Sequence, residues 1–221
     1  MHGQLSFLQA NVNHAAGAQD LLLQSMAEWQ VDLAVACEPY FVPPLPHWLG
    51  DSDDTVVVLT RSGTGPPLSL IERGSGYVVV GWGEYVVVGT YFSPNRSLVE
   101  FETYLGLVRA AVARQSPKPI MVLGDLNAKS RAWGNPVTNP RGRAVQVWAL
   151  LSDLSLFNRG QVQTCVRHQG GSVVDVSFAT PPIARRVVDW RVEEEVDREL
   201  VKGGRHCATM GFRGEEGGRQ R

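Results

Sequence analysis

Residues 119–128 read Pro119-Ile-Met-Val-Leu-Gly124-Asp125-Leu126-Asn127-Ala128, an apolar run that ends in a glycine, a carboxylate and an amide. The run predicts a short buried strand over 119–124, followed by a polar loop over 125–143. Side chains two residues apart on extended backbone point the same way, so Asp125 and Asn127 would share one cleft. An Asp that orients or deprotonates water beside an Asn that donates to a phosphate oxygen suits phosphodiester hydrolysis. The other interpretation is an Asx turn that closes the strand.

Apolar runs on both sides of this stretch predict a strand-rich α/β fold. Valine triplets mark three of the strands, and Trp82-Gly83-Glu84 is typical of a hairpin turn. Expected strands cover residues 5–12, 31–37, 56–58, 78–80, 86–88, 161–166, 173–179, 187–193 and 206–212, with helices over 15–29, 99–115 and 144–151 and a turn over 168–172. This order suits two packed mixed sheets with helices outside, rather than a doubly wound parallel sheet or a (β/α)₈ barrel.

The composition is that of one globular domain. The chain has 221 residues, of which 43% are hydrophobic, and no apolar run approaches the ~18 residues of a membrane span. We therefore expect no membrane partner, a single domain over residues 1–212, and a disordered, polar, glycine-rich tail over 213–221. The three cysteines lie far apart without a C-x-x-C pair, which predicts free thiols in a reducing compartment.

Charge is distributed unevenly along the chain. The formal net charge is -1, which by itself argues against a nucleic-acid partner. The first 60 residues, however, hold seven of the 22 acids and none of the 21 bases, so the rest of the chain is net basic. Most of the bases are arginines, whose planar guanidinium suits bidentate phosphate contacts, although scattered solvated charges would give the same count.

Polar residues also stand at the ends of other expected strands. Asn11 ends the first strand, Glu38 the second, and Tyr91 follows the Val86 strand, while Asp175 lies inside an apolar strand where an unpaired carboxylate is costly. Capping, turn chemistry or a satisfied buried polar group could explain each one separately. Together with Asp125 they form an oxygen-rich set that suits Mg²⁺ better than zinc.

These motifs, in this order and rough spacing, resemble the endonuclease/exonuclease/phosphatase superfamily. The similarity is greatest to the apurinic/apyrimidinic-type endonuclease domain of non-LTR retrotransposons, within them to site-specific arthropod elements that insert into ribosomal DNA, and it runs from about residue 4 to residue 212. The motifs that carry it are Gln9-Ala10-Asn11, Glu38-Pro39-Tyr40, Tyr91-Phe92-Ser93-Pro94, Gly124-Asp125-Leu126-Asn127-Ala128, Trp133-Gly134, Thr164 and Ser172-Val173-Val174-Asp175.

The resemblance implies a four-layer α/β sandwich of two mixed β-sheets flanked by helices. It also implies Mg²⁺-dependent nicking of one DNA strand, with Mn²⁺ as an alternative ion, and the 3′-hydroxyl would prime reverse transcription by the rest of a larger polyprotein in the nucleus. By position, Glu38 and Asn11 would hold the metal, Asp125 would orient or activate water, Asn127 would hold the phosphate, and Tyr91 would contact it. Asp175 would be an acid behind these groups.

The loop after Asp125 carries the candidate DNA contacts. It combines cations with an aromatic ring and contains no acid between residues 128 and 143, which suits phosphate clamping and groove contact. A solvated loop with the tryptophan buried beneath it is the competing interpretation. The candidate DNA-binding residues are Lys129, Arg131, Trp133, Asn135, Arg141 and Arg143, with Thr164 added by the resemblance.

The chain departs from the family pattern near its C-terminus. The family closes with Ser-Asp-His, whereas this chain has Gly204, Arg205 and His206. In the family that Asp fixes the tautomer of the catalytic His and stabilises its charged form, and an adjacent Arg does neither. Activity impaired by Arg205 is therefore one expectation. The alternatives are a catalytically weakened DNA-binding targeting module and a phosphoesterase acting on a phosphoinositide or small phosphate ester.

If Arg205 impairs the site, Arg205→Asp raises the rate of Mg²⁺-dependent nicking of supercoiled plasmid, because the carboxylate restores a partner for His206. Gel quantification of open-circular DNA measures the change. An unchanged or lower rate would contradict a role for Arg205.

Overall fold

Valine-rich strands form the centre of the molecule. The computed structural model describes residues 4–63, 65–159, 162–167, 170–193, 206–207 and 209–215. In β4 (Val56–Thr60), the side chains of Val56 and Val58 face the second sheet and that of Val57 faces a helix layer. Both faces of these strands are covered, which explains continuous valine runs in place of an alternating apolar and polar pattern.

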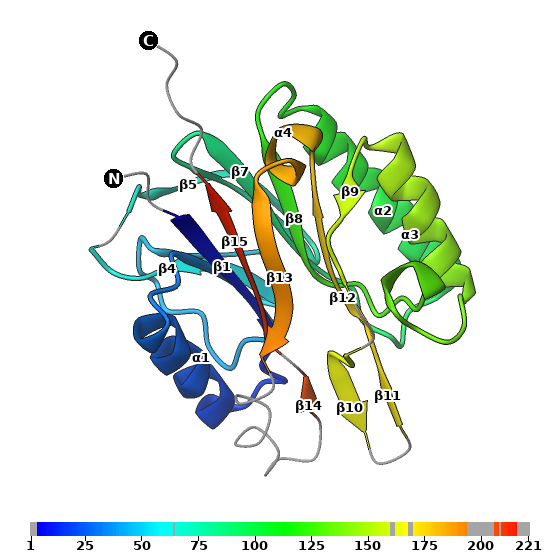
Figure 1. Ribbon diagram of the computed structural model, residues 1–221, viewed down its shortest axis with the longest axis horizontal. Helices are drawn as coiled ribbons and strands as arrows, with labels where there is room; N and C mark the ends of the chain where they lie inside the picture. The colour runs from blue at the N-terminus through cyan, green and yellow to red at the C-terminus, as the bar shows by residue number, and fades with distance from the viewer. Residues whose placement is uncertain are drawn as a thin grey trace.

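The described strands form two six-stranded mixed sheets packed face to face (Figure 1). The first sheet has the order β13 (Val187–Glu193), β15 (Thr209–Glu215), β1 (Gln4–Asn11), β2 (Leu33–Cys37), β4 and β3 (Trp48–Gly50). The second has the order β5 (Leu68–Gly74), β6 (Tyr77–Trp82), β7 (Tyr85–Tyr91), β8 (Ile120–Asp125), β12 (Asp175–Ala179) and β9 (Ser155–Leu156). A small sheet of β11 (Gly170–Ser172), β10 (Cys165–Arg167) and β14 (His206–Cys207) lies at the lower edge in Figure 1.

Helices cover the outer faces of both sheets. Helix α1 (Ala16–Glu28) packs on the first sheet, and α2 (Leu98–Ala113) and α3 (Pro140–Leu151) pack on the second (Figure 1). A short helix α4 (Pro181–Ala184) precedes β13, and a 3₁₀ turn spans Arg131–Trp133. The expected sandwich of two mixed sheets flanked by helices is confirmed.

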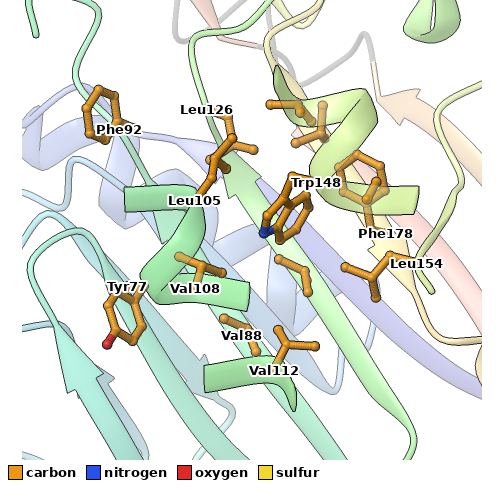
Figure 2. Close-up of a cluster of buried hydrophobic side chains, with 14 of the residues drawn as sticks. Tyr77, Val88, Phe92, Leu105, Val108, Val112, Leu126, Trp148, Leu154 and Phe178 are labelled. Atoms are coloured by element: carbon orange, nitrogen blue, oxygen red, sulfur yellow. The ribbon is translucent and has the colours of Figure 1, made fainter. Parts of the chain in front are cut away.

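Three apolar layers hold these elements together. One lies between the sheets, one under α1, and one under α2 and α3, which contains Trp148, Phe178 and the other side chains shown in Figure 2. The buried face of α2 is the one that its 3.6-residue periodicity predicts. Its members are Phe101, Tyr104, Leu105, Val108, Ala111 and Val112.

Several expected boundaries differ from the structure. Helix α3 begins at Pro140 rather than at residue 144, because Asn139 caps it by accepting from Gly142 N and proline is favourable in the first turn. The strand expected over 161–166 is β10 at Cys165–Arg167, and the expected turn over 168–172 contains β11. Strand β15 continues through residues 213–215, which we expected to belong to the tail. The sequence patterns did not indicate β3, β5 or β9.

Gly124 allows β7 and β8 to approach closely just before the motif at the end of β8. Its φ is +154°, and a Cβ there would lie 1.7 Å from the carbonyl oxygen of Thr90 on β7. The described part of the chain contains no helix long and apolar enough to cross a membrane.

Gly124→Ala is expected to lower the free energy of unfolding by about 2 kcal/mol or more, because the added methyl forces the paired strands apart. Gly106→Ala is the matched control, since a Cβ at this position in α2 meets nothing within 4 Å. This control should stabilise the protein by roughly 0.5–1 kcal/mol through helix propensity. Urea denaturation measures both values, and equal midpoints for the two variants would contradict the close-approach argument.

Candidate active site

Polar side chains from both large sheets meet at the ends of their central strands. Asn11 is the last residue of β1, Glu38 directly follows β2, and Asp125 is the last residue of β8. Asn11 Nδ2 donates to Asp125 Oδ2 over 3.1 Å, and the Tyr91 hydroxyl donates to Glu38 Oε1 over 2.6 Å. Each bond pairs a residue of one sheet with a residue of the other, so the packing of the sheets itself assembles this cluster.

Asp125 is held within a turn as well as across the sheets. Its side chain is only 2% exposed, and its Oδ1 accepts from the Asn127 backbone N over 2.8 Å. Asn127 has a left-handed φ of +46°, and its Nδ2 donates to the Phe92 carbonyl over 3.1 Å. The backbone therefore forms an Asx turn here and does not continue as a strand, which means that turn chemistry, not strand alternation, places the two side chains.

Glu38 is the more accessible acid, with a side chain 22% exposed. Its φ is +49°, and His14 Nε2 lies 3.7 Å from its Oε1. His14 Nδ1 is 3.1 Å from the Pro39 carbonyl, which only accepts, so Nδ1 carries the hydrogen and Nε2 faces the carboxylate. Burial raises the pKa of Tyr91 well above its usual range, and the hydrogen bond to Glu38 raises it further. The phenol therefore remains a neutral donor.

Asp175 lies fully buried behind Asp125, its cross-strand partner between β12 and β8. Gln9 Nε2 approaches its Oδ1 at 3.5 Å, and Thr164 Oγ1 accepts from the Asp175 backbone N over 3.3 Å. Burial first, and the charge of Asp125 second, raise the pKa of Asp175 well above the usual carboxyl range. Its Oδ2 has no hydrogen-bond partner among the described residues. Asp175 therefore holds its proton to a higher pH than an ordinary Asp does.

Three cations of residues 128–143 are exposed, namely Lys129 and Arg131 in the loop and Arg143 in the first turn of α3. Arg131 also borders a hollow of about 490 Å³ between this loop and the β10–β11 hairpin. Gly134, Asn135, Pro136, Gln163, Gly171, Ser172 and Val173 complete its lining. This surface can hold phosphates through its cations and offers backbone and amide groups beside them.

Three other candidate DNA contacts are buried. Trp133 is 2% exposed and donates from Nε1 to the Ala128 carbonyl, so it packs beneath the loop and presents no ring face to DNA. The Asn135 amide bonds to both backbone groups of Val173, at 2.7 and 3.0 Å. Thr164 is fully buried and binds the backbone at Asp175. These side chains fasten the loop and the adjoining strand, whereas we expected them to contact DNA directly.

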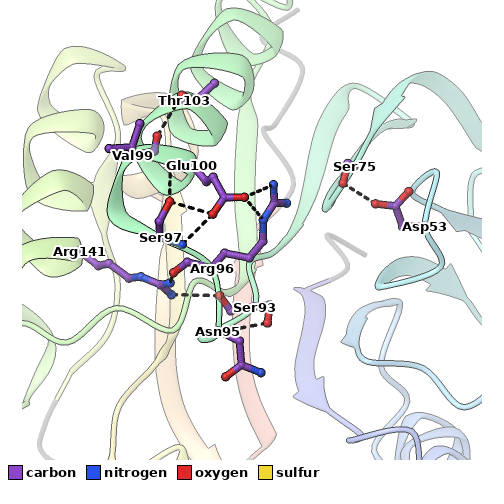
Figure 3. Close-up of polar contacts among 10 residues, drawn as sticks. All are labelled: Asp53, Ser75, Ser93, Asn95, Arg96, Ser97, Val99, Glu100, Thr103 and Arg141. Atoms are coloured by element: carbon purple, nitrogen blue, oxygen red, sulfur yellow. Dashed lines mark hydrogen bonds and ion pairs between the residues drawn. The ribbon is translucent and has the colours of Figure 1, made fainter.

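Arg141 bridges α3 and the segment before α2 (Figure 3). Its guanidinium donates to the carbonyls of Ser93 and Pro94, both at 3.2 Å, and to that of Arg96. It also lies 5.2 Å from the ring centroids of Phe92 and Phe101. These contacts occupy the cation that we expected to bind DNA.

The comparisons agree with this geometry. A family described as "Endonuclease-reverse transcriptase" matches residues 85–197, which include Tyr91, Asp125, Asn127 and Asp175. The chain belongs to the endonuclease-reverse transcriptase family. No curated protein sequence matches it.

Solved structures share the fold over nearly the whole chain. The endonuclease domain of TRAS1, a telomere-specific non-LTR retrotransposon, is 26% identical, with a TM-score of 0.80 over 96% of this chain and 98% of that one. An AP endonuclease from Archaeoglobus fulgidus is 14% identical, with a TM-score of 0.72 over 94% and 98%. The 3′ phosphatase NExo from Neisseria, bound to a product DNA hairpin, is 17% identical, with a TM-score of 0.71 over 94% and 98%. The family member described here therefore has the endonuclease/exonuclease/phosphatase fold.

The donor set fits the divalent metal that this superfamily typically uses. The groups that could hold an ion are the Glu38 carboxylate and the amide oxygen of Asn11, both hard oxygen donors, and the Asn11 oxygen also accepts from the Asn13 backbone N over 2.9 Å. Cys37, next to Glu38 in sequence, is buried and directs its thiol to the Thr90 carbonyl, and burial raises its pKa, so it offers no thiolate. The described residues hold no group of three His, Cys, Asp or Glu side chains placed to enclose a metal. A site with only one or two protein ligands is normal for Mg²⁺, because this ion usually keeps several waters and also binds the phosphate of the substrate.

Two residues in this site, His14 and Gln9, were not among the predicted site residues. His14 reaches Glu38 because Asn13 and His14 both adopt left-handed φ, near 50° and 55°. Gln9 has a signal similar to that of Asp175, a polar side chain inside an apolar strand.

His206 belongs by its backbone to β14, opposite Val166, and its side chain lies outside what the structure describes, as do Gly204 and Arg205.

Arg141→Ala is expected to lower the free energy of unfolding by about 1.5–3 kcal/mol, because charge-assisted bonds to three carbonyls are lost together. Arg143→Ala is the control, since this exposed side chain makes a long 3.4 Å bond to the Thr138 carbonyl. Urea denaturation measures stability, and the salt dependence of DNA binding is measured in parallel. A stable Arg141→Ala variant with a flattened salt slope would show that Arg141 contacts phosphate instead.

Proposed function

We propose that this chain is a Mg²⁺-dependent endonuclease that nicks one strand of double-stranded DNA and leaves a 3′-hydroxyl to prime reverse transcription. The observation that carries the proposal is the Asp125 carboxylate, fixed by Asn11 and by the Asn127 turn beside the Glu38–Tyr91 pair. In this proposal the chain acts in the nucleus as part of a larger reverse-transcriptase polyprotein. Similarity to TRAS1, described as telomere-specific, supports insertion at a fixed site, and ribosomal DNA is our proposed target.

The chain's own residues divide the work of phosphodiester hydrolysis. Asp125 orients the attacking water and accepts its proton, and Asn127 holds the phosphate. Tyr91 remains protonated and donates to Glu38 or to a phosphate oxygen. Glu38 and Asn11 hold Mg²⁺ or Mn²⁺, which would neutralise charge that develops on the phosphate. His206 would protonate or stabilise the leaving oxygen.

The raised pKa of Asp175 supports the role of Asp125. Two adjacent ionised carboxylates in a buried site repel each other, so one of the pair retains a proton. Asp175 is the more buried of the two, and burial and the charge of Asp125 raise its pKa, so in this proposal Asp175 keeps the proton and Asp125 accepts one from water.

Asp125→Asn is expected to reduce nicking of supercoiled plasmid in Mg²⁺ by about 10²- to 10⁴-fold, because the amide keeps the turn but accepts no proton. Asp153→Asn is the control, an exposed Asp after α3 whose φ of +52° an asparagine tolerates. Extension of the nick by a DNA polymerase tests for the 3′-hydroxyl, and EDTA should abolish the product.

Two results would favour the alternatives. Wild-type protein that binds DNA but does not nick it in Mg²⁺ or Mn²⁺ would indicate a targeting module. This is the outcome expected if Arg205 impairs the catalytic site. Phosphate release from phosphoinositide vesicles without plasmid nicking would indicate a lipid or small-ester phosphoesterase.

A further inference from the structure

The turn after Glu38 presents two adjacent aromatic side chains to solvent. Tyr40 is 61% exposed and Phe41 is 58% exposed, whereas Pro39 before them is buried. Single exposed apolar residues are common on proteins, but two neighbouring rings beside a reactive carboxylate are a larger apolar surface with a definite position.

The backbone beneath these rings is held rigidly by Gln19 in α1. Gln19 Oε1 accepts from the backbone N of Tyr40 at 2.8 Å and from that of Phe41 at 3.3 Å, and its Nε2 donates to the Phe41 carbonyl at 2.9 Å. One side chain thus satisfies three main-chain groups of two consecutive residues. The rings therefore project from an ordered support, and less conformational entropy is lost when they bind a ligand.

The same turn is also tied to the active site at its other end. The Glu38 backbone N donates to the Thr55 carbonyl at 2.8 Å, and the Glu38 carbonyl accepts from His14 N at 2.7 Å. The Glu38 carboxylate and the two rings are therefore parts of one fixed segment. A substrate that reaches Glu38 passes close to the turn.

The charge pattern decides which part of a nucleic acid the turn can recognise. The first 60 residues contain no Lys or Arg, so neither β1, α1, β2 nor this turn supplies a cation for phosphate. Aromatic rings instead stack on base faces or insert as wedges between base steps, with little dependence on sequence. Cations for the phosphates lie on the 128–143 loop, in Lys129, Arg131 and Arg143.

We propose that Tyr40 and Phe41, held by Gln19, form a stacking element that contacts the bases of the DNA next to the scissile phosphate. This inference rests on the proposed endonuclease function and adds a base-contacting surface to it. Stacking contributes to affinity and to the position of the nick, without taking part in the chemistry.

The experiment compares Tyr40→Ala and Phe41→Ala with the ring-preserving changes Tyr40→Phe and Phe41→Tyr in the full 221-residue chain. Fluorescence anisotropy with a 30-base-pair duplex in EDTA measures affinity. Each alanine variant should bind about 5- to 100-fold more weakly, and the ring-preserving variants should bind within about twofold of wild type. The slope of affinity against salt should not change, because no phosphate contact is lost.

Matched controls separate the turn from the rest of the protein. Gln19→Ala should weaken binding, whereas Gln24→Ala on the same helix should not, because Gln24 bonds to Glu28 and not to the turn. Leu150→Ala removes an apolar side chain that is 80% exposed on α3 and should leave binding unchanged. Hydrolysis of bis(p-nitrophenyl) phosphate in Mg²⁺ should also be unchanged in all the turn variants, since that substrate has no flanking bases.

Alanine variants that bind duplex as tightly as wild type would overturn the stacking proposal and would leave a protein partner as the occupant of the turn. A flattened salt slope would overturn it as well, since it would mean a phosphate contact. Failure of the wild-type protein to nick plasmid would instead count against the endonuclease function, so the two proposals fail separately.

Discussion

Asp125 is a nearly buried carboxylate whose two oxygens are held from two directions, by the Asn11 side chain across the sheets and by the Asn127 backbone in its own turn. Burial of such a charge is costly unless hydrogen bonds replace its water. The Asn11 bond exists only when β1 and β8 end at the same level in their sheets, whereas the Asn127 bond is local to the turn. The close approach at Gly124 and the layer of valines between the sheets serve this alignment, so the fold and the site share one geometric requirement.

Two acidic groups beside Asp125 release their protons at a higher pH than usual. The pKa of Asp175 is raised by burial and by the neighbouring charge, and the pKa of Tyr91 is raised by burial and by Glu38. Folding therefore takes up a proton at Asp175 when the pH lies above the usual carboxyl pKa, and this group opposes folding more as the pH rises towards its native pKa. Asp125 and Glu38 are the two carboxylates that a cation, or a phosphate with its metal, would approach.

Much of the fold could be predicted because both faces of the central strands are buried, which gives long apolar runs. The buried face of α2 and the polar residues at the ends of β1, β2, β7 and β8 follow from simple periodicity. The start of α3 was harder to predict, since proline and glycine, as at Pro140 and Gly142, are typical of loops. The hydrogen bond by which Asn139 caps the helix is visible only in the structure. The positions of the Trp133 and Arg141 side chains depend on tertiary contacts. Local sequence does not reveal which side chains of such a segment pack inward. The approach of His14 to Glu38 depends on two consecutive residues with left-handed φ, and no sequence pattern indicated this backbone conformation.

The net charge of -1 conceals a division between the two sides of the site. The segment that provides Asn11, Glu38 and the aromatic turn has no cation, and the segment that follows Asp125 has exposed Lys129, Arg131 and Arg143. A duplex that touched both sides would gain phosphate contacts on one and base contacts on the other. A small number of cations also keeps the non-specific affinity for DNA low. Base contacts therefore contribute more to positioning the DNA than charge attraction does.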